Sequence, residues 1–338
     1  MKKVILIVSL LIVAIFANAQ DPNFSQFFSS PLNVNPALTA RINSDWRLIS
    51  NFRDQWIGPA SPYATGTISY DTKILQNKIP NVHDEKNILG IGGMLMYDYA
   101  MDGIMKSTYG SANLSYNIVL SDGPVVHRLG AGFGATYGRR TVDFSRLTWE
   151  EQWVGYSGFD KNLPTGESAL TNMKPFFSVS SGLVYSMTSE KSNFDLGIAG
   201  FHLNTPKQTF LEDQNQRLAM RKVVHANFET FLNNTLVLNT NAIYQFQQQA
   251  KYYSFGAGLG YYLPQDPDVI LNAGMWYWSN NAVIPYVGFA YKDFQFGLSY
   301  DVTVSRLATA SVKPKTFELS LIYRGTKEPL GGIPCPWQ

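Results

Sequence analysis

Residues that could do chemistry occur in this sequence, but their spacing fits no metal site. The histidines lie far apart, no His-Glu-x-x-His motif joins two of them, and the single cysteine leaves no pair to complete a zinc site. The four histidines are His83, His127, His202 and His225. We therefore expect no bound metal.

Two further motifs imitate catalytic or cofactor signatures. The segment GAGFGA at 130–135 has the glycine spacing of a dinucleotide fingerprint, but no helical pattern follows to offer its N-terminus to a phosphate. Gly155 and Ser157 fall short of a nucleophile elbow because Phe159 stands where the second glycine is needed. We predict a protein that is not an enzyme and binds no cofactor, although a Ser-His or Asp-His set scattered over several strands would leave no local signature.

The first residues of the chain have the order of a secretory signal peptide. Lys2 and Lys3 precede an apolar run at 4–16, and Ala17-Asn18-Ala19 follows as a cleavage site. The apolar run is shorter than the roughly 20 residues that a membrane-spanning helix needs. We expect residues 1–19 to be removed on export and the mature chain to begin at Gln20.

Composition favours a membrane protein built from strands. Only 15% of the residues are charged, where about 25% is usual, and the net charge is +2, so nucleic acid is not an expected partner. Aromatic residues are abundant, with 19 Tyr, 21 Phe and 7 Trp. No long apolar run follows residue 16. An exported chain of this kind is typical of a transmembrane β-barrel, because its lipid-facing and lumen-facing residues alternate.

Alternation with period two recurs along the chain. Residues 111–120 place Ala, Leu, Tyr, Ile and Leu on one face and Ser and Asn on the other. Residues 128–138 alternate apolar and aromatic residues with a face bearing Gly130, Gly132 and Gly134, which suits a tightly curved wall or a filled lumen. Residues 316–323 place Glu318 on the inward face. Each pattern predicts a wall strand.

These patterns predict an all-β fold, a transmembrane antiparallel β-barrel of about 14 strands with an irregular N-terminal segment. The other expected strands are 45–56, 63–71, 87–98, 176–186, 194–204, 222–231, 236–247, 252–263, 269–278, 283–291 and 294–301. A soluble β-sandwich is the alternative, but it would need a second sheet for its apolar rows. We expect a signal peptide at 1–19, a periplasmic or plug segment at 20–44, the barrel at 45–323 and a tail at 324–338.

Several polar residues are candidates for structural or partner-binding roles. Arg53 and Asp54 are adjacent on a strand, so only one of them can face the lumen, and we expect Arg53 to form an ion pair there. Tyr300 and Asp301 are expected to be an interfacial aromatic and a turn-starting carboxylate at a strand end. His202 is expected to form hydrogen bonds within the wall or lumen.

The segment at 20–40 is too rich in Pro and Asn for a strand. It is either a plug of the lumen, or a cover of the periplasmic mouth, or a loose leader. Cys335 is expected to be a free thiol on the tail, with no assigned role.

Six segments, in order, resemble the PorP/SprF family of type IX secretion membrane proteins. They are QDPNFSQFFSSPLNVNPALTA at 20–40, NFRDQW at 51–56, TVDF at 141–144 with LTW at 147–149, FHLNTP at 201–206, GLSYDV at 297–302 and IPCP at 333–336. The chain departs from the family in WYW at 276–278 and in its last two residues. The resemblance covers nearly the whole mature chain. It marks Asn35, Pro36, Arg53, Asp54, Gln55, Trp56, His202, Ser299, Tyr300 and Asp301 as candidate structural or partner residues.

The resemblance implies an outer-membrane component of the type IX secretion system. Such a barrel would bind the C-terminal domain of a secreted adhesin or effector and support its export or its anchoring at the cell surface, with roles in gliding and adhesion. Its partners would be that cargo domain, outer-membrane lipid and, in an alternative role as a core part of the machine, periplasmic ring lipoproteins. A passive porin or solute channel is the second alternative.

Overall fold

The computed structural model describes residues 21–58, 61–79, 81–82, 86–167, 172–208 and 216–325. The expected signal peptide, His83 and the end of the chain with Cys335 lie outside these residues. Among the described residues, no helix has the length and hydropathy to cross a membrane.

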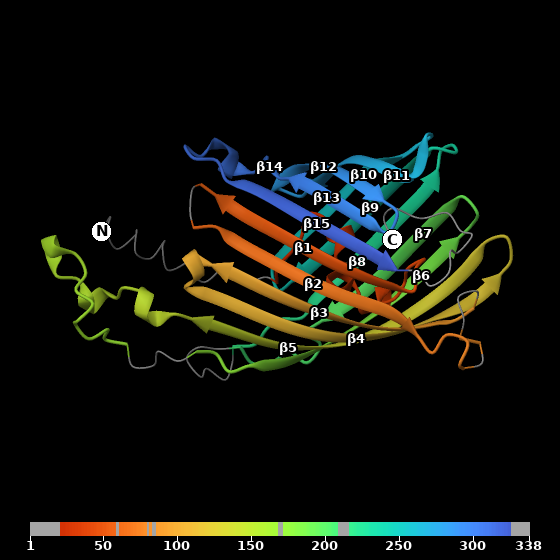
Figure 1. Cartoon of the computed structure of the whole chain (residues 1–338). Coiled ribbons are helices and arrows are strands. Elements are labelled where there is room, and N and C mark those ends of the chain that lie inside the picture. Colours follow the sequence, from red (N-terminus) through yellow and green to blue (C-terminus); the bar gives the residue numbers. More distant parts are fainter. Residues whose placement is uncertain are drawn as a thin grey trace.

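The described chain folds into a closed antiparallel β-barrel (Figure 1). Its strands are β1 Trp46–Ile57, β2 Tyr63–Ile74, β3 Ile88–Ala100, β4 Met105–Asp122, β5 Val126–Val142, β6 Phe176–Thr188, β7 Ser192–Phe201, β8 Arg221–Phe231, β9 Leu236–Gln247, β10 Ala250–Leu263, β11 Asp266–Trp278, β12 Ala282–Tyr291, β13 Phe294–Tyr300, β14 Val302–Thr303 and β15 Lys315–Gly325. β1 pairs with β15 and closes the sheet. β13 and β14 both pair with β12 and are two parts of one wall strand, interrupted at Asp301. The wall therefore has 14 strands, as the sequence predicts.

Alternation along each strand separates a lipid-facing surface from a polar lumen. On β4, Leu114 is 49% exposed, whereas its neighbours Asn113 and Ser115 are 5% and 1% exposed. The same division appears on β15, where Leu321 is exposed and Glu318 is buried. Because successive side chains of a strand point to opposite faces, the sequence pattern alone sets which face meets lipid.

Aromatic side chains gather on the outer surface near both ends of the barrel. At one end, Tyr323 lies against Trp46 and Phe294, with ring centroids 5.1 and 4.3 Å away. At the other end, Tyr277 lies 5.7 Å from Phe255 and 6.4 Å from Tyr253. Two such belts are typical of barrels whose ends meet the two membrane interfaces.

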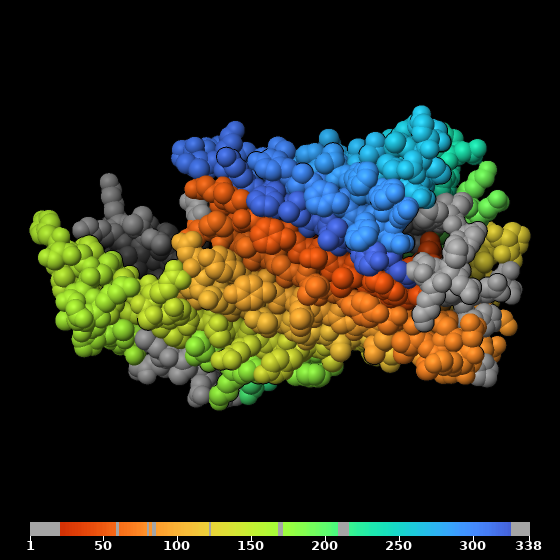
Figure 2. Space-filling model, viewed as in Figure 1, coloured from red at the N-terminus to blue at the C-terminus, as the bar shows by residue number. Residues whose placement is uncertain are grey.

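The two rims of the barrel differ in their connections. One carries the long segments 143–175 and 202–220, and we call it the long-loop rim. The 143–175 loop projects beyond the wall, at the left of Figures 1 and 2. It holds the 3₁₀ helices η4 Phe144–Arg146, η5 Glu150–Gln152 and η6 Gly155–Ser157; the same rim bears η3 Met101–Gly103 and η7 Arg306–Thr309. The opposite, short-turn rim joins β4–β5, β6–β7, β8–β9, β10–β11 and β12–β13 by tight turns and carries one longer connection at 75–87.

Residues 21–44 lie inside the barrel, where all of them except Asn43 are buried or half-buried, and we call them the plug. The plug contains η1 Phe27–Ser29, the one-turn helix α2 Pro31–Val34 and η2 Pro36–Leu38. A proline opens both α2 and η2, where its fixed φ fits and its missing N–H costs nothing. The Asn35 side chain caps η2 by accepting a hydrogen bond from the Ala37 N–H at 2.9 Å. This proline-rich local chemistry explains why the segment forms short turns and not a strand.

The main apolar core lies between the plug and the wall. Phe27 and Val34 of the plug pack with buried residues of β7, β8, β9, β11 and β12. Phe28 lies over Trp276, with ring centroids 4.7 Å apart. The lumen is therefore a packed interior.

Candidate functional site: the plug and the lumen wall

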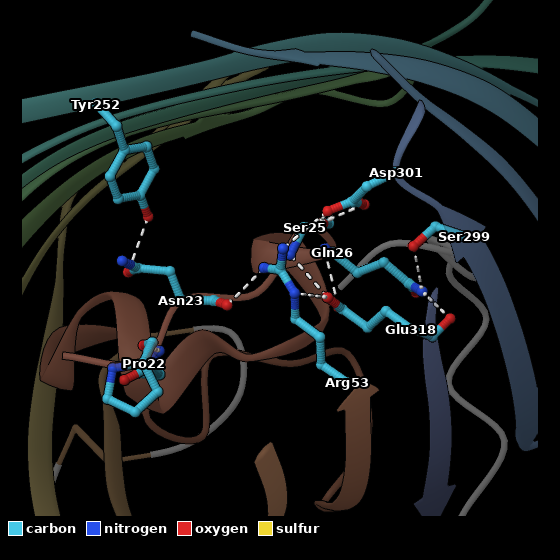
Figure 3. Close-up of polar contacts among 10 residues, drawn as sticks. Pro22, Asn23, Ser25, Gln26, Arg53, Tyr252, Ser299, Asp301 and Glu318 are labelled. Atoms are coloured by element: carbon cyan, nitrogen blue, oxygen red, sulfur yellow. Dashed lines mark hydrogen bonds and ion pairs between the residues drawn. The ribbon is translucent and has the colours of Figure 1, made fainter. Parts of the chain in front are cut away.

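The plug is held by a cluster of buried charges on β1 and β15 (Figure 3). Glu318 accepts hydrogen bonds from the backbone N–H groups of Ser25 and Gln26, at 2.7 and 2.9 Å. Arg53 donates to the carbonyl oxygen of Asn23 at 2.6 Å and pairs with Asp301 at 2.8 Å. Arg53 is 1% exposed and Glu318 is fully buried. Buried charges this close must be paired and hydrogen-bonded, and here the plug backbone completes the set.

Strand register brings these charges together. Arg53 on β1 lies directly opposite Glu318 on β15, and Ser299 on β13 is the next neighbour of Glu318. The Gln26 side chain uses the same row, donating to Ser299 at 3.0 Å and accepting from Ser320 at 2.7 Å. Three neighbouring strands thus present one polar surface to the plug, with β13 and β15 contacting Ser25 and Gln26 and β1 contacting Asn23.

Asn35 anchors the middle of the plug to the opposite wall. Its amide donates to the carbonyl oxygens of Leu183 on β6 and Ile198 on β7, at 3.0 and 3.2 Å. The same amide nitrogen lies 3.0 Å from Nε2 of His225 on β8. Because Asn35 also caps η2, one side chain fixes both the shape of the plug and its position.

Glycines on the inner wall make room for this contact. A Cβ atom on Gly132 would overlap the backbone of Pro36 and Ala37. Cβ atoms on Gly182 and Gly197 would meet the Asn35 side chain, and one on Gly90 would meet Ala40. On the bare face of 128–138, Gly132 makes room for the plug, whereas Cβ atoms on Gly130 and Gly134 would meet side chains of the neighbouring wall strands.

The beginning of the plug is fixed at the long-loop rim. The Asp21 carboxylate lies 2.8 Å from Nε2 of His202 and 3.2 Å from Nε of Arg221. His202 Nδ1 lies 2.8 Å from the Ser178 hydroxyl. The carboxylate, largely withdrawn from solvent, is thus partnered by an imidazole and a guanidinium.

The end of the plug is fixed near the short-turn rim. Asp71 on β2 accepts a hydrogen bond from the Ala40 N–H at 2.7 Å and pairs with Arg47 at 2.8 Å. Arg41 pairs with Asp195 on β7. The plug is therefore held at its beginning, middle and end by polar contacts.

A small cavity remains beside the plug. It measures about 70 Å³ and is lined by Phe27, Pro31 and Val34 of the plug and by Asp195, His225 and Asn241 of the wall, among others. A single water needs about 10–15 Å³ by this measure, so the cavity has room for a few water molecules.

Five of the sequence-derived candidates face the lumen and touch the plug or belong to it: Asn35, Pro36, Arg53, His202 and Ser299. Asp301 joins them, which corrects our expectation of a turn-starting carboxylate. Its side chain is buried, binds Arg53 and accepts from the Ser25 hydroxyl at 2.8 Å. The alternation of β13 continues through Asp301, which has the same inward phase as Gln295 and Ser299, so its side chain enters the lumen.

The remaining candidates do not join the cluster. Trp56 and Tyr300 are exposed, and Asp54 and Gln55 are half-buried near the long-loop rim. The sequence reasoning missed the roles of Asp21, Glu318, Arg221, Asp71 and Asp195. The one available signal was inward charge on a predicted strand, which marked Glu318 but named no partner for it.

Within the described residues, no three His, Cys, Asp or Glu side chains gather closely enough to hold a metal ion. The buried charges instead pair with one another and with the plug. The arrangement is suited to closing a lumen and offers no evident set of reacting groups.

Solved structures with a similar fold are outer-membrane transport barrels. The Ralstonia pickettii toluene transporter TbuX aligns with a TM-score of 0.53 and 10% identity, over 88% of this chain and 93% of that one. A mutant of the TodX monoaromatic hydrocarbon channel aligns with a TM-score of 0.50 and 10% identity, over 86% and 92%. At this identity the likeness shows the fold alone. No curated protein sequence matches this chain.

The family comparison extends over almost all of the described barrel. The model of the type IX secretion system membrane protein PorP/SprF matches residues 16–323, which include the plug and the wall strands up to the last two residues of β15. This match agrees with the resemblance found in the sequence motifs. The chain belongs to the PorP/SprF family of type IX secretion system membrane proteins.

Proposed function

We propose that this protein is a non-enzymatic outer-membrane barrel that binds the C-terminal domain of a secreted adhesin or effector and supports its export or its anchoring at the cell surface. Membership of a type IX secretion family and a transport-type barrel fold support the setting. A signal peptide at 1–19 would bring the chain to the outer membrane. Roles in gliding or adhesion would follow from the cargo that it holds.

The filled lumen carries the proposal that the barrel is an anchor and not the conduit. The plug is fixed to β1, β6, β7, β13 and β15 and packs against the main apolar core. A folded domain or an extended polypeptide would have to displace this whole set of contacts. Cargo would therefore be held from outside the lumen.

The 143–175 loop offers a surface for such binding. Trp153, Tyr156 and Phe159 are exposed on it, and the rings of Trp153 and Phe159 lie 4.8 Å apart. The described residues of this loop are held by their own hydrogen bonds, including one from the buried Gln152 side chain to the Leu163 carbonyl at 3.0 Å. Exposed aromatics on a preformed loop are the residues that contribute most to protein interfaces.

The test is an affinity pull-down of the tagged barrel from detergent-solubilised outer membranes, followed by mass spectrometry. The expected result is a very large secreted protein retained through its C-terminal domain. Periplasmic ring lipoproteins without such a cargo would instead favour the role of a core part of the secretion machine. Recovery of neither a secreted cargo nor ring lipoproteins would contradict the proposal.

A matched pair of variants locates the binding rim. Trp153→Ser/Tyr156→Ser/Phe159→Ser removes the exposed aromatics of the long-loop rim, whereas Leu75→Ser/Ile79→Ser removes exposed apolar side chains of the short-turn rim. Only the first variant should lose the cargo in the pull-down. Loss with the second variant alone would place binding on the opposite rim.

A solute channel is the second candidate, because the two similar barrels described above are a toluene transporter and a monoaromatic hydrocarbon channel. The filled lumen argues against a solute channel, because the plug occupies the path that a solute would take. Steady ohmic conductance from the intact purified protein in a planar bilayer would favour the channel over the pure anchor.

A further inference from the structure

The plug contacts both rims of the barrel. Directly after its last residue, the Asp45 N–H donates to the carbonyl oxygen of Gly325 at 2.9 Å, where β1 begins and β15 ends on the short-turn rim. At its beginning, the Asp21 N–H donates to the side chain of Gln247 at 3.0 Å. Gln247 is the last residue of β9, on the long-loop rim. The chain from 21 to 45 therefore runs the length of the lumen.

Contacts between these two ends follow in order. Ser25 binds Glu318, which lies in the long-loop half of β15. Asn35 binds the middle of β6 and β7. Ala40 binds Asp71, which is four positions into β2 from the short-turn rim. The plug thus crosses the barrel once, from the long-loop rim to the short-turn rim, without folding back to its starting rim.

The connections of the wall orient the barrel in the membrane. Bacterial outer-membrane barrels have short periplasmic turns and longer extracellular loops. Here the loops 143–175 and 202–220 are on one rim, and five tight turns are on the other. By this rule the long-loop rim faces the cell exterior, and the junction between the plug and β1 faces the periplasm.

From these two arguments we infer that the plug crosses the outer membrane inside the barrel and displays its beginning, at Asp21, on the outside of the cell. The cluster of Asp21, His202 and Arg221 then holds the outer end of the plug among the extracellular loops. This topology does not depend on cargo binding. It predicts that a group attached in front of Asp21 is accessible from outside.

The test places single reactive cysteines in a Cys335→Ser background, because the chain has only one cysteine. The first variant carries a Cys followed by a Gly-Ser spacer between Gln20 and Asp21. Tyr156→Cys marks the long-loop rim, and Glu190→Cys marks an exposed short turn between β6 and β7. The probe is a membrane-impermeant maleimide, applied to intact cells and to cells with a permeabilised outer membrane. Heat-modifiable mobility in gel electrophoresis checks that each barrel is folded.

The expected result is equal labelling of the inserted cysteine and of Tyr156→Cys in intact and permeabilised cells, with Glu190→Cys labelled only after permeabilisation. An inserted cysteine that reacts only in permeabilised cells, while Tyr156→Cys reacts in intact ones, would overturn the crossing. Reaction of Glu190→Cys in intact cells with Tyr156→Cys protected would overturn the orientation. A folded barrel whose inserted cysteine reacts in neither state would place that end inside the wall and also contradict the proposal.

Discussion

At the scale of single residues, Arg53 joins three parts of the chain. It pairs with Asp301 after β13, lies opposite Glu318 on β15 and donates to the plug at Asn23. Its guanidinium also lies over the Trp278 ring at 4.7 Å. A planar group with five donors suits this position because it can serve several acceptors at once.

Replacing Arg53 should destabilise the folded barrel strongly. Arg53→Ala leaves Asp301 and Glu318 as neighbouring buried carboxylates, and breaking a buried pair in this way costs about 3–5 kcal/mol. Arg53→Lys should cost less, because it keeps the positive charge and loses only the planar guanidinium that serves several acceptors. Urea unfolding in lipid vesicles, followed by heat-modifiable mobility, measures both. The exposed Arg139→Ala is the control, and an equal loss there would contradict the role of Arg53.

Gly132→Ala should destabilise the barrel only when the plug is present. Its Cβ would overlap the backbone of Pro36 and Ala37, and such overpacking costs about 1–3 kcal/mol. Gly110→Ala is the matched control, since its Cβ would meet only Leu95 at an ordinary 3.5 Å. Unfolding free energies with and without residues 21–40 form a double-mutant cycle. A cost that persists without the plug would assign Gly132 to the wall alone.

At the scale of elements, the plug and the wall are complementary surfaces. Short turns capped by Asn35 meet a wall face stripped of side chains at Gly132 and Gly182. Polar plug residues meet inward charges on β1 and β15. The polar groups of each surface find their hydrogen-bond partners on the other, as buried polar groups require.

Deleting residues 21–40 should open the barrel to ions. The wall remains paired through β1 and β15, while the polar groups now facing the lumen recruit water. Planar-bilayer recording should show steady conductance from the deletion variant and none from the intact protein. The variant Trp153→Ser/Tyr156→Ser/Phe159→Ser serves as a control that should stay closed. A deletion variant as silent as the intact protein would mean that the wall itself closes the lumen.

At the scale of the whole molecule, closure of the lumen and binding at the rim are separate properties. The plug is enclosed by the wall, whereas Trp153 and Phe159 stand on a loop beyond it. We expect the plug-deleted barrel to conduct ions and still retain the cargo in the pull-down. The aromatic triple variant should lose the cargo and remain closed. Joint loss of both properties in either variant would show that they are coupled.

The sequence alone determined the wall. Period-two alternation is local, so residues such as Asn113 and Leu114 could be assigned to lumen and lipid before any strand pairing was known. The same local pattern exposed the bare face at Gly130, Gly132 and Gly134 and the inward Glu318. It also separated Arg53 from Asp54, because adjacent strand residues point to opposite faces.

Only the tertiary structure decided which segment fills the lumen and in which direction that segment runs through the barrel. Arg53 and Asp301 are 248 positions apart and meet only because the last strands close against β1. The contact of Asn35 with His225 likewise depends on where the whole barrel places its wall. A one-dimensional pattern fixes the face of a residue but not its partner across a closed sheet. The alternation of 294–301 is enough to turn Asp301 inward, whereas its pairing with Arg53 and Ser25 follows only from the closed barrel.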